Sequence, residues 1–222
     1  MVVDRVVAVA AMIVLAPVVV VLAVLVKRHD RGPAFVRVER VGRSFESFMM
    51  WKLRTMRADL PDGRAIGTPL TTGNDDRITP IGRRLRSSHL DELPQLLNVA
   101  RGEMLLLGPR PETPEFVDHE DERWRAVLQV PPGIAGPTQL VAGDWESQLI
   151  TDDPDGDAYA EVVLPVKLAI DAWYVERASL ARDLEVLVAL AALFLPAVTA
   201  ARLRRRIARE VPAAAVLTNR AR

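Results

Sequence analysis

The sequence has no cysteine and few histidines, and its charges cancel. Among its 222 residues the histidines are His29, His89 and His119, while lysine and arginine total 29 and aspartate and glutamate also total 29. The lack of cysteine excludes a disulfide framework and a thiolate metal site. His119-Glu120 lacks the second histidine of a zinc-protease helix, so that site is excluded too. A net charge of zero gives no sign of a nucleic-acid partner, and we expect none.

One long segment without charge, from Val6 to Val26, dominates the N-terminal region. As a helix it would be about 30 Å long, the thickness of a hydrocarbon core, and the plain interpretation is a spanning helix. Pro17, in the middle, removes a backbone hydrogen bond and favours a bend. Basic residues, which prefer the cytoplasmic side, flank both ends: Arg5 before the segment, then Lys27, Arg28 and Arg31. A re-entrant helix with both ends on one face is equally compatible with these features.

The remaining residues predict an α+β domain that is mostly helical. The segment 30–56 is strand-prone. Apolar residues at helical spacing predict helix over residues 80–99, broken near Pro94, and a further helix over residues 114–129. Polar or proline- and glycine-rich loops are expected over residues 57–77, 131–137 and 152–157.

The C-terminal region holds a second apolar helix, within residues 184–209, that ends in several arginines. It is either a core helix with a basic tail or an amphipathic helix on the membrane, with its arginines at anionic headgroups. We therefore divide the chain into a membrane-embedded helix (1–29), a catalytic domain (30–183), a membrane-associated C-terminal helix (184–209) and a tail expected to be disordered (210–222).

Asp91 and Glu92 are adjacent carboxylates in the string Leu90-Asp91-Glu92-Leu93-Pro94-Gln95-Leu96. Because proline suits the first turn of a helix, we expect the pair near a helix start, where the helix dipole favours ionised acids. Acids in such a position often serve only as caps. Alternatively the pair divides a reaction, one acid holding Mg²⁺ while the other acts as nucleophile or base.

Basic residues surround the acidic pair in the sequence. Arginines bind phosphate oxygens through paired hydrogen bonds and therefore complement a metal-bound diphosphate. The alternative for these residues is a solvated face or contact with anionic lipid headgroups. Together with the apolar segment, they suggest phosphate chemistry at a lipid surface. The candidate substrate-binding residues are Lys52, Arg54, Arg83, Arg86 and Arg110.

Several strings resemble one known family. They closely resemble strings of the bacterial sugar transferases, the monotopic phosphoglycosyl transferases that act on polyprenol phosphate. The similarity covers about residues 4–190. Its central strings are Thr79-Pro80-Ile81-Gly82-Arg83-Arg84-Leu85-Arg86, Leu90-Asp91-Glu92-Leu93-Pro94-Gln95-Leu96-Leu97-Asn98-Val99, Gly102-Glu103-Met104 and Gly108-Pro109-Arg110-Pro111-Glu112.

The resemblance implies a reaction. Family members transfer a sugar 1-phosphate from a nucleotide diphosphate sugar, usually a UDP-sugar, to a polyprenol phosphate such as undecaprenyl phosphate, and release UMP. The mechanism attributed to them is ping-pong. By position, Asp91 would be the nucleophile that forms a covalent phosphosugar intermediate, and Glu92 would assist through Mg²⁺ or by handling a proton. The basic positions that match the family's are Arg86 and Arg110, expected at the diphosphate, and Lys52 and Arg54.

The resemblance also implies a location. The family's re-entrant helix is broken near a proline, which matches Pro17. The catalytic domain would then sit on the cytoplasmic face of the bacterial inner membrane, with membrane lipids as partners. We expect a minimal form, without the multi-span domain of larger relatives, that starts an exopolysaccharide, lipopolysaccharide or glycoprotein glycan. The sugar is not specified by the sequence, and a homodimer is left open.

The sequence departs from the family's pattern at a few positions. His89 stands where a small hydroxyl residue is common, and Asp144 follows Gly143 where the family has arginine; Leu105, Leu106 and Ala135 also differ. Two alternative functions follow: a catalytically silent membrane scaffold, against which the intact acidic pair argues, and a magnesium-dependent phosphohydrolase of lipid diphosphates. The fate of the nucleotide separates them, because only the transferase yields UMP while passing sugar phosphate to lipid.

Overall fold

The computed structural model describes residues 1–60, 75–149, 157–191 and 198–217. Most of these residues are helical, and the strands among them form two-stranded sheets, which confirms the mostly helical α+β prediction. The α-helices are α1 (Val2–Asp30), α2 (Pro80–Ser87), α3 (Leu96–Arg101), α4 (Glu122–Val127), α5 (Pro137–Leu149), α6 (Leu164–Glu176), α7 (Leu180–Ala191) and α8 (Val198–Glu210). The strands are β1 (Phe35–Val41), β2 (Ser47–Leu53), β3 (Leu105–Leu107) and β4 (Gly133–Ala135). The 3₁₀ and π segments are η1 (Arg43–Phe45), η3 (Leu90–Gln95), η4 (Pro114–Phe116), η5 (Tyr159–Val163) and η6 (Pro212–Leu217).

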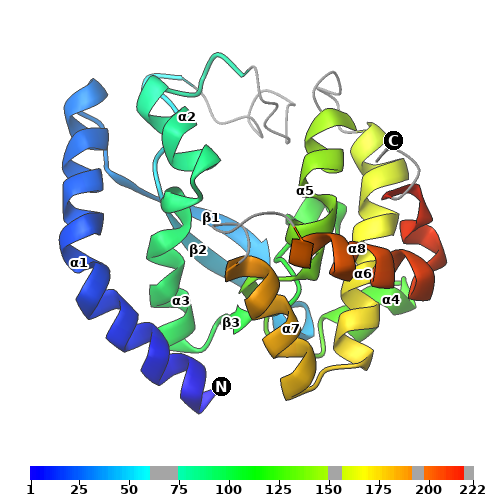
Figure 1. The fold of residues 1–222 in the computed structure, drawn as a ribbon. Helices are drawn as coiled ribbons and strands as arrows, with labels where there is room; N and C mark the ends of the chain where they lie inside the picture. Colours follow the sequence, from blue (N-terminus) through cyan, green and yellow to red (C-terminus); the bar gives the residue numbers. More distant parts are fainter. Residues whose placement is uncertain (61–74, 150–156, 192–197, 218–222) are drawn as a thin grey trace.

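The long helix α1 packs along the domain rather than extending from it (Figure 1). In its N-terminal half, the fully buried Ala8 packs against β2 and α3. Near its other end, Val26 packs with Leu53 and Leu85. By length and composition α1 could cross a membrane, and most of its apolar side chains face outward. Pro17 lies inside the helix, which bends along its length but continues without a break, unlike the broken helix expected from the sequence.

The segment 30–56 contains strands, as predicted, and the structure pairs them as the antiparallel hairpin of β1 and β2. Phe35 pairs with Leu53 at one end of the hairpin and Val41 with Ser47 at the other. This register places Lys52 opposite Val36, next to the last residue of β2. The cation therefore lies near the open end of the hairpin.

The helical region predicted over residues 80–99 is divided by a sharp reversal. Thr79 caps the N-terminus of α2 with its side chain. His89, with a φ of 55°, then separates α2 from the short helix η3, which continues into α3. A left-handed residue cannot continue a right-handed helix, so the break lies at His89. Pro94, where the sequence predicted the break, lies inside η3.

The short strands β3 and β4 pair in parallel and bring two glycine-containing loops together. Leu105 pairs with Gly133, and a Cβ built on Gly133 would lie only 2.1 Å from the backbone nitrogen of Gly108. Only glycine permits so close an approach of two backbones. β4 lies within the segment 131–137, which was expected to be all loop. Its partner strand is distant in sequence, so no local pattern indicates the pairing.

The C-terminal helices complete a large core with α5 and α6. Instead of the single helix predicted within 184–209, the structure has α7 and α8, with residues 192–197 between them outside the described part. Val186 and Ile207 are fully buried, so these helices belong partly to the core. Leu180 and Leu184 of α7 are exposed. The cluster's buried residues include Val141, Trp145, Tyr159, Ile170, Trp173, Leu203 and Ala214.

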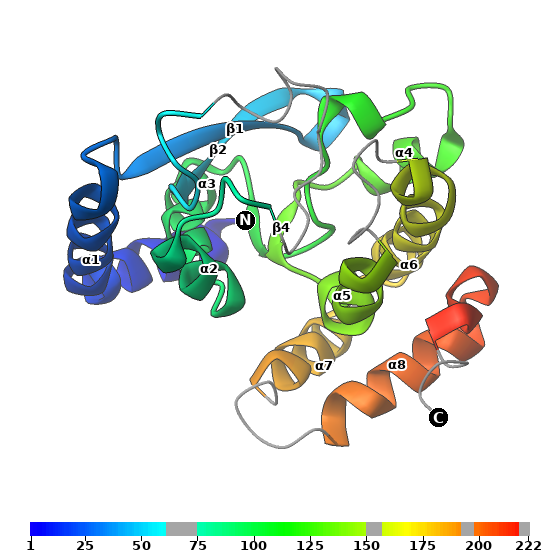
Figure 2. The ribbon, with the colours of Figure 1, turned by 90° about the horizontal axis from the view of Figure 1, so that it is seen from above.

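Two further predictions are corrected. The tail 210–222, expected to be disordered, contains the 3₁₀ helix η6, because the apolar side chains of Ala214 and Leu217 are buried in the core; residues 218–222 lie outside the description. The helix predicted over 114–129 is shorter, consisting of the turn η4 and then α4. Figure 2 shows α1, α2 and α3 on one side of the molecule and α4 to α8 on the other, with β4 between them.

Candidate active site

Asp91 and Glu92 lie in the first turn of η3, directly after the left-handed His89, and both are buried. Glu92 Oε1 accepts hydrogen bonds from Lys52 Nζ at 2.9 Å and Arg110 Nη2 at 2.6 Å, and Oε2 accepts one from Arg110 Nη1 at 3.3 Å. Burial raises the pKa of Glu92, but Arg110 and Lys52 outweigh burial and hold this pKa below its usual value. Glu92 is therefore an ionised carboxylate that joins two cations.

Asp91 has quite different surroundings from Glu92. Its Oδ2 lies 3.8 Å from Lys52 Nζ, and no residue in the described part of the chain donates a hydrogen bond to its carboxylate. Arg86, whose Nε donates to Thr55 Oγ1 at 2.8 Å, also interacts electrostatically with Asp91. The site thus combines one carboxylate available for a ligand with nearby positive charge.

Lys52 reaches the acidic pair because Asn98 ties β2 to α3. Asn98 is fully buried; its Oδ1 accepts from the Trp51 backbone nitrogen at 3.0 Å, and its Nδ2 donates to the Met49 carbonyl at 2.9 Å and to Glu103 Oε2 at 2.7 Å. This amide satisfies the backbone nitrogen of Trp51, the residue before Lys52, and the carbonyl of Met49, so it fixes the end of β2 against α3. No sequence pattern indicates this role for Asn98, although the residue lies within the string that carries the resemblance.

Arg110 follows β3 in the loop that contacts β4. Pro109 and Pro111 restrict its backbone, and the close contact between Gly108 and Gly133 fixes the loop against β4. The Arg110 side chain is 30% exposed, so it can meet a ligand while remaining paired with Glu92. Arg83, in contrast, is exposed on α2 and stays a predicted substrate contact.

Arg54 has a structural role that the sequence did not predict. Its Nη1 and Nη2 donate to the two carboxylate oxygens of Asp30 at 2.5 Å each, its Nε donates to the Pro33 carbonyl at 2.5 Å, and Nη1 also donates to the Met56 carbonyl at 2.9 Å. The side chain of Arg54 is only 6% exposed. Arg54 therefore joins the end of α1 to the end of β2, and the structure does not bring it to the acidic pair.

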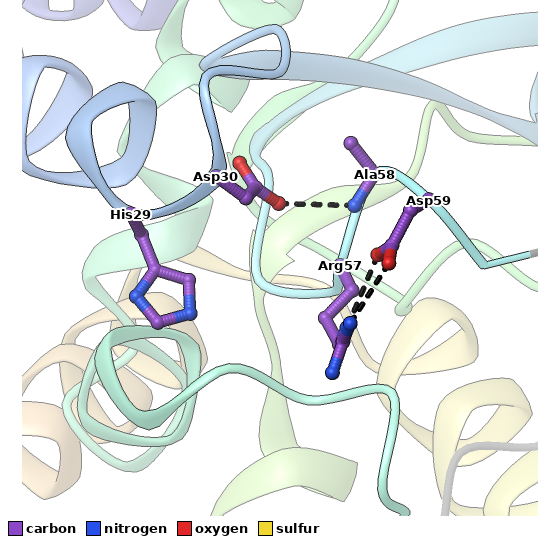
Figure 3. Close-up of a pocket in the computed structure, with 5 residues that line it drawn as sticks. All are labelled: His29, Asp30, Arg57, Ala58 and Asp59. Atoms are coloured by element: carbon purple, nitrogen blue, oxygen red, sulfur yellow. Dashed lines mark hydrogen bonds and ion pairs between the residues drawn. The ribbon is translucent and has the colours of Figure 1, made fainter.

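A cavity of about 520 Å³ lies beside this joint, lined by His29, Asp30, Arg57, Ala58 and Asp59 (Figure 3). Arg57 pairs with Asp59 through hydrogen bonds of 3.1 and 2.8 Å, and Asp30 accepts from the Ala58 backbone nitrogen at 3.0 Å. These groups already have partners, and none of the predicted site residues lines the cavity. It is therefore not the candidate active site.

A model of the family described as Bacterial sugar transferase matches residues 1–195. The match covers most of the chain and includes Asp91, Glu92 and the cations that meet them. The chain belongs to the bacterial sugar transferase family.

Similar proteins carry names of the same kind. The UDP-glucose:undecaprenyl-phosphate glucose-1-phosphate transferase of Caulobacter vibrioides is 34% identical over 178 residues, 78% of this chain and 61% of that protein. The undecaprenyl-phosphate glucose phosphotransferase of Komagataeibacter xylinus is 38% identical over 165 residues, 72% of this chain and 30% of that protein. The UDP-N-acetylgalactosamine-undecaprenyl-phosphate N-acetylgalactosaminephosphotransferase of Aeromonas hydrophila is 35% identical over 145 residues, which are 63% of this chain and 33% of that protein. This chain therefore spans less than two thirds of the length of these relatives.

The structure locates the positions at which this chain departs from the family pattern. His89 is exposed, and its left-handed backbone directs the chain from α2 into η3. Ala135 pairs with Leu107 in the sheet of β3 and β4. The side chain of Asp144 lies outside the described part, so the departure at that position stays a prediction.

The structure also contains a charged cluster that the sequence did not reveal. Lys167 Nζ lies 2.7 Å from the Tyr159 hydroxyl, 3.1 Å from Glu146 Oε1 and 3.6 Å from Glu112 Oε2, and the Tyr159 hydroxyl donates to Glu112. Glu112 is two residues beyond Arg110 and belongs to the string that carried the resemblance. Glu146 and Lys167 come from α5 and α6, and no local pattern connects them to the site.

Proposed function

We propose that this sugar transferase moves a sugar 1-phosphate from a UDP-sugar to a polyprenol phosphate, such as undecaprenyl phosphate, and releases UMP. The observation that carries this proposal is the contrast within the acidic pair: Glu92 holds Lys52 and Arg110, while the neighbouring Asp91 keeps a carboxylate without hydrogen bonds among the described residues. Relatives named for glucose 1-phosphate and N-acetylgalactosamine phosphate transfer support the reaction class. Because their donors differ, the proposal leaves the sugar open.

In the proposed first step, Asp91 attacks the phosphorus atom that carries the sugar. A bond forms between a carboxylate oxygen and this phosphorus, and the bond from the phosphorus to the bridging oxygen breaks. That oxygen leaves with the electron pair as part of UMP, and the sugar phosphate stays on Asp91 as an acyl phosphate. Two anions repel each other, and the nearby charges of Lys52, Arg86 and Arg110 reduce this repulsion.

In the proposed second step, an oxygen of the lipid phosphate attacks the same phosphorus. The bond from phosphorus to Asp91 breaks, which regenerates the carboxylate and yields polyprenol diphosphate sugar. Glu92 is a weak base in this step, because Arg110 and Lys52 hold its pKa low against the effect of burial. We therefore assign Glu92 to holding these two cations beside the nucleophile rather than to removing a proton.

We further propose Mg²⁺ as the cofactor, held by the Asp91 carboxylate. Mg²⁺ at phosphate sites often uses one or two carboxylates together with phosphate oxygens and water. Asp91 can serve as such a ligand because its carboxylate is available. Glu92 could bind the ion only after its ion pair with Lys52 or Arg110 is broken. No group of three or more histidine, aspartate or glutamate residues that could hold a metal occurs in the described ranges. When bound, the ion would neutralise charge on the diphosphate.

We also propose that α1 enters and leaves the membrane on the cytoplasmic face of the bacterial inner membrane. Near its start, Arg5 Nη2 donates to the Arg101 carbonyl at 3.4 Å, and at its end Asp30 pairs with Arg54. Both ends therefore contact the same domain, whereas a straight helix of 29 residues, roughly 44 Å long, would place them on opposite sides of a bilayer. The exposed apolar residues of α7, such as Leu180, would make further contact with membrane lipids.

The test is UMP release by the full chain in detergent with Mg²⁺ and a panel of UDP-sugars, with and without undecaprenyl phosphate. We expect a single burst of about one UMP per protein without acceptor, and continuous release with it, as a ping-pong mechanism requires. Asp91→Asn should abolish both. Continuous turnover by Asp91→Asn would refute the covalent step. Release of inorganic phosphate would indicate a phosphohydrolase. If no donor yields UMP or inorganic phosphate, the protein would be a catalytically silent scaffold.

A further inference from the structure

Lys167 is a buried cation that contacts two carboxylates, one more than is required to neutralise its charge. Its side chain is 9% exposed, and a buried ammonium is stable only when it is paired. Two carboxylates, Glu112 and Glu146, share this one cation. Glu112 is otherwise satisfied, because its Oε1 accepts from the Thr113 backbone nitrogen at 2.9 Å and its Oε2 accepts from the Tyr159 hydroxyl.

Glu146 differs from Glu112 because part of its carboxylate is unused. Its Oε1 accepts a hydrogen bond from Lys167 at 3.1 Å, while its Oε2 receives none from the residues that the structure describes. The Glu146 side chain is 25% exposed. Lys167 thus anchors one oxygen and leaves the other as an acceptor that a ligand can reach.

Glu146 is also coupled to the candidate active site. Lys167, which Glu146 contacts at 3.1 Å, also lies 3.6 Å from Glu112, two residues beyond Arg110. Burial lowers the pKa of Arg110, but Glu92, Glu146 and Glu112 outweigh burial and raise it. Arg110 in turn is bonded to Glu92, the neighbour of Asp91. A donor whose diphosphate meets Arg110 would therefore bring its attached rings close to Glu146.

We propose that Glu146 recognises carbohydrate hydroxyl groups of the nucleotide-sugar donor, and that Lys167 is the positioning residue that orients it. This inference rests on the proposed function. An ionised carboxylate only accepts hydrogen bonds, so it repels the phosphates and must meet a neutral part of the donor that donates. Hydroxyl groups are such neutral donors, and a hydrogen bond from a hydroxyl to a carboxylate is stronger than a hydrogen bond between two neutral groups. The hydroxyl belongs to the transferred sugar or to the ribose, as it does where an acid binds the ribose of a dinucleotide.

The experiment compares Glu146→Gln with Glu161→Gln, a matched change of an exposed glutamate in η5. With the full chain in detergent and its best UDP-sugar, we expect Glu146→Gln to raise the KM for the donor about tenfold or more. Glu161→Gln should leave it unchanged. Inhibition by UMP, which contains the ribose but not the transferred sugar, then shows which hydroxyl Glu146 contacts. If the inhibition constant of UMP is the same for Glu146→Gln and the wild type, the hydroxyl belongs to the transferred sugar. If the constant rises as much as the KM, the hydroxyl belongs to the ribose.

Lys167→Met is the second variant, and it should raise the donor KM in the same way because Glu146 loses its anchor. Lys167→Arg, which keeps the cation, should restore part of the affinity. An unchanged donor KM in Glu146→Gln, with a melting temperature close to that of the wild type, would overturn the inference. If the wild type releases no UMP, the proposed function fails, and calorimetric binding of UDP-glucose and UDP decides instead: weaker binding by Glu146→Gln supports the role, and equal binding overturns it.

Discussion

Asp91 and Glu92 are adjacent side chains with the same chemistry, yet their neighbours give them different surroundings. Lys52 and Arg110 occupy the oxygens of Glu92, whereas Asp91 keeps its lone pairs available. A carboxylate whose lone pairs are engaged by two cations is a poor nucleophile and a poor base. The proposed division of labour therefore follows from the residues that contact each acid.

Glu92→Gln should release Lys52 and Arg110 from their shared partner. We expect turnover to fall by at least about 100-fold, because the positive charge beside Asp91 is no longer held in place. The melting temperature should also fall, by the equivalent of about 1–3 kcal/mol, since two partly buried cations lose a charged acceptor. Assays of UMP release and thermal unfolding measure both effects, with the exposed Glu122→Gln as control. Recovery of turnover at high Mg²⁺ would instead indicate that Glu92 is chiefly a metal ligand.

Asp171 should make the stability of the fold depend on pH. It is buried beside Thr138, and burial raises its pKa to about 7, although Thr138 and Lys167 lower it and Glu112 and Glu146 raise it further. Between about pH 4 and 7 the unfolded chain loses this proton while the folded chain keeps it, so rising pH destabilises the fold.

Asp171→Asn keeps an acceptor for Thr138 and removes the titration. Relative to the wild type, the variant should therefore gain stability from about pH 4 to about pH 8, by up to about 4 kcal/mol. Thermal unfolding of both proteins across this range is the measurement. A difference in melting temperature that stays constant with pH would contradict the assignment.

At the scale of elements, the joint between α1 and β2 holds α1 against the domain. Arg54 and Asp30 form it with two hydrogen bonds of 2.5 Å, and backbone groups of Gly32 and Ala58 also donate to Asp30. Burial opposes ionisation of Asp30, but the bonds from Arg54 are the largest effect and lower its pKa. The end of α1 is thereby fixed to the strand that carries Lys52.

Removing either partner of this joint should leave the other as a buried charge without its counter-ion. Arg54→Met leaves Asp30 without its cation, and we expect a loss of about 3–5 kcal/mol in the free energy of unfolding; Asp30→Asn should behave similarly. The double variant should lose less than the sum of the two single losses. Thermal unfolding of the four proteins measures the coupling. If Arg54 instead binds substrate, Arg54→Met would raise the donor KM while leaving the unfolding temperature unchanged.

At the scale of the whole molecule, the candidate site is assembled from both sides of the fold. The side with α1, α2 and α3 carries the acidic pair and Lys52, and the side with α4 to α8 carries Glu146 and Lys167 (Figure 2). Arg110 lies in the loop after β3, whose pairing with β4 connects the two sides. Membrane attachment through α1 would then hold this assembly at the level of a lipid phosphate.

The absence of cysteine permits a direct test of how α1 sits in the membrane. Val2→Cys and Arg31→Cys would each introduce a single thiol, one near each end of α1. For a re-entrant helix, a membrane-impermeant maleimide should label both in inside-out inner-membrane vesicles and neither in intact spheroplasts. Glu161→Cys, in the domain, is the control. Labelling of Val2→Cys from the outer face alone would establish a spanning helix.

Local sequence was enough to predict the apolar helix, the strand-forming segment 30–56, the mostly helical fold and the acidic pair at a helix start. Each of these depends on residues close together in the chain, where periodicity, proline and glycine act directly. The resemblance of the same strings to the bacterial sugar transferases predicted the family, and the match to the family model confirms this prediction.

Only the tertiary structure decided which cations meet which acids. Lys52 joins Glu92 across 40 positions and Arg110 joins it across 18, while Arg54 turns to Asp30 and Glu146 pairs with Lys167 across 21. The ordered segment η6 and the strand β4 likewise depend on distant partners. An arginine or glutamate has the same local pattern whether it binds substrate or a neighbouring helix, because its role is set by burial and by charges that folding brings near.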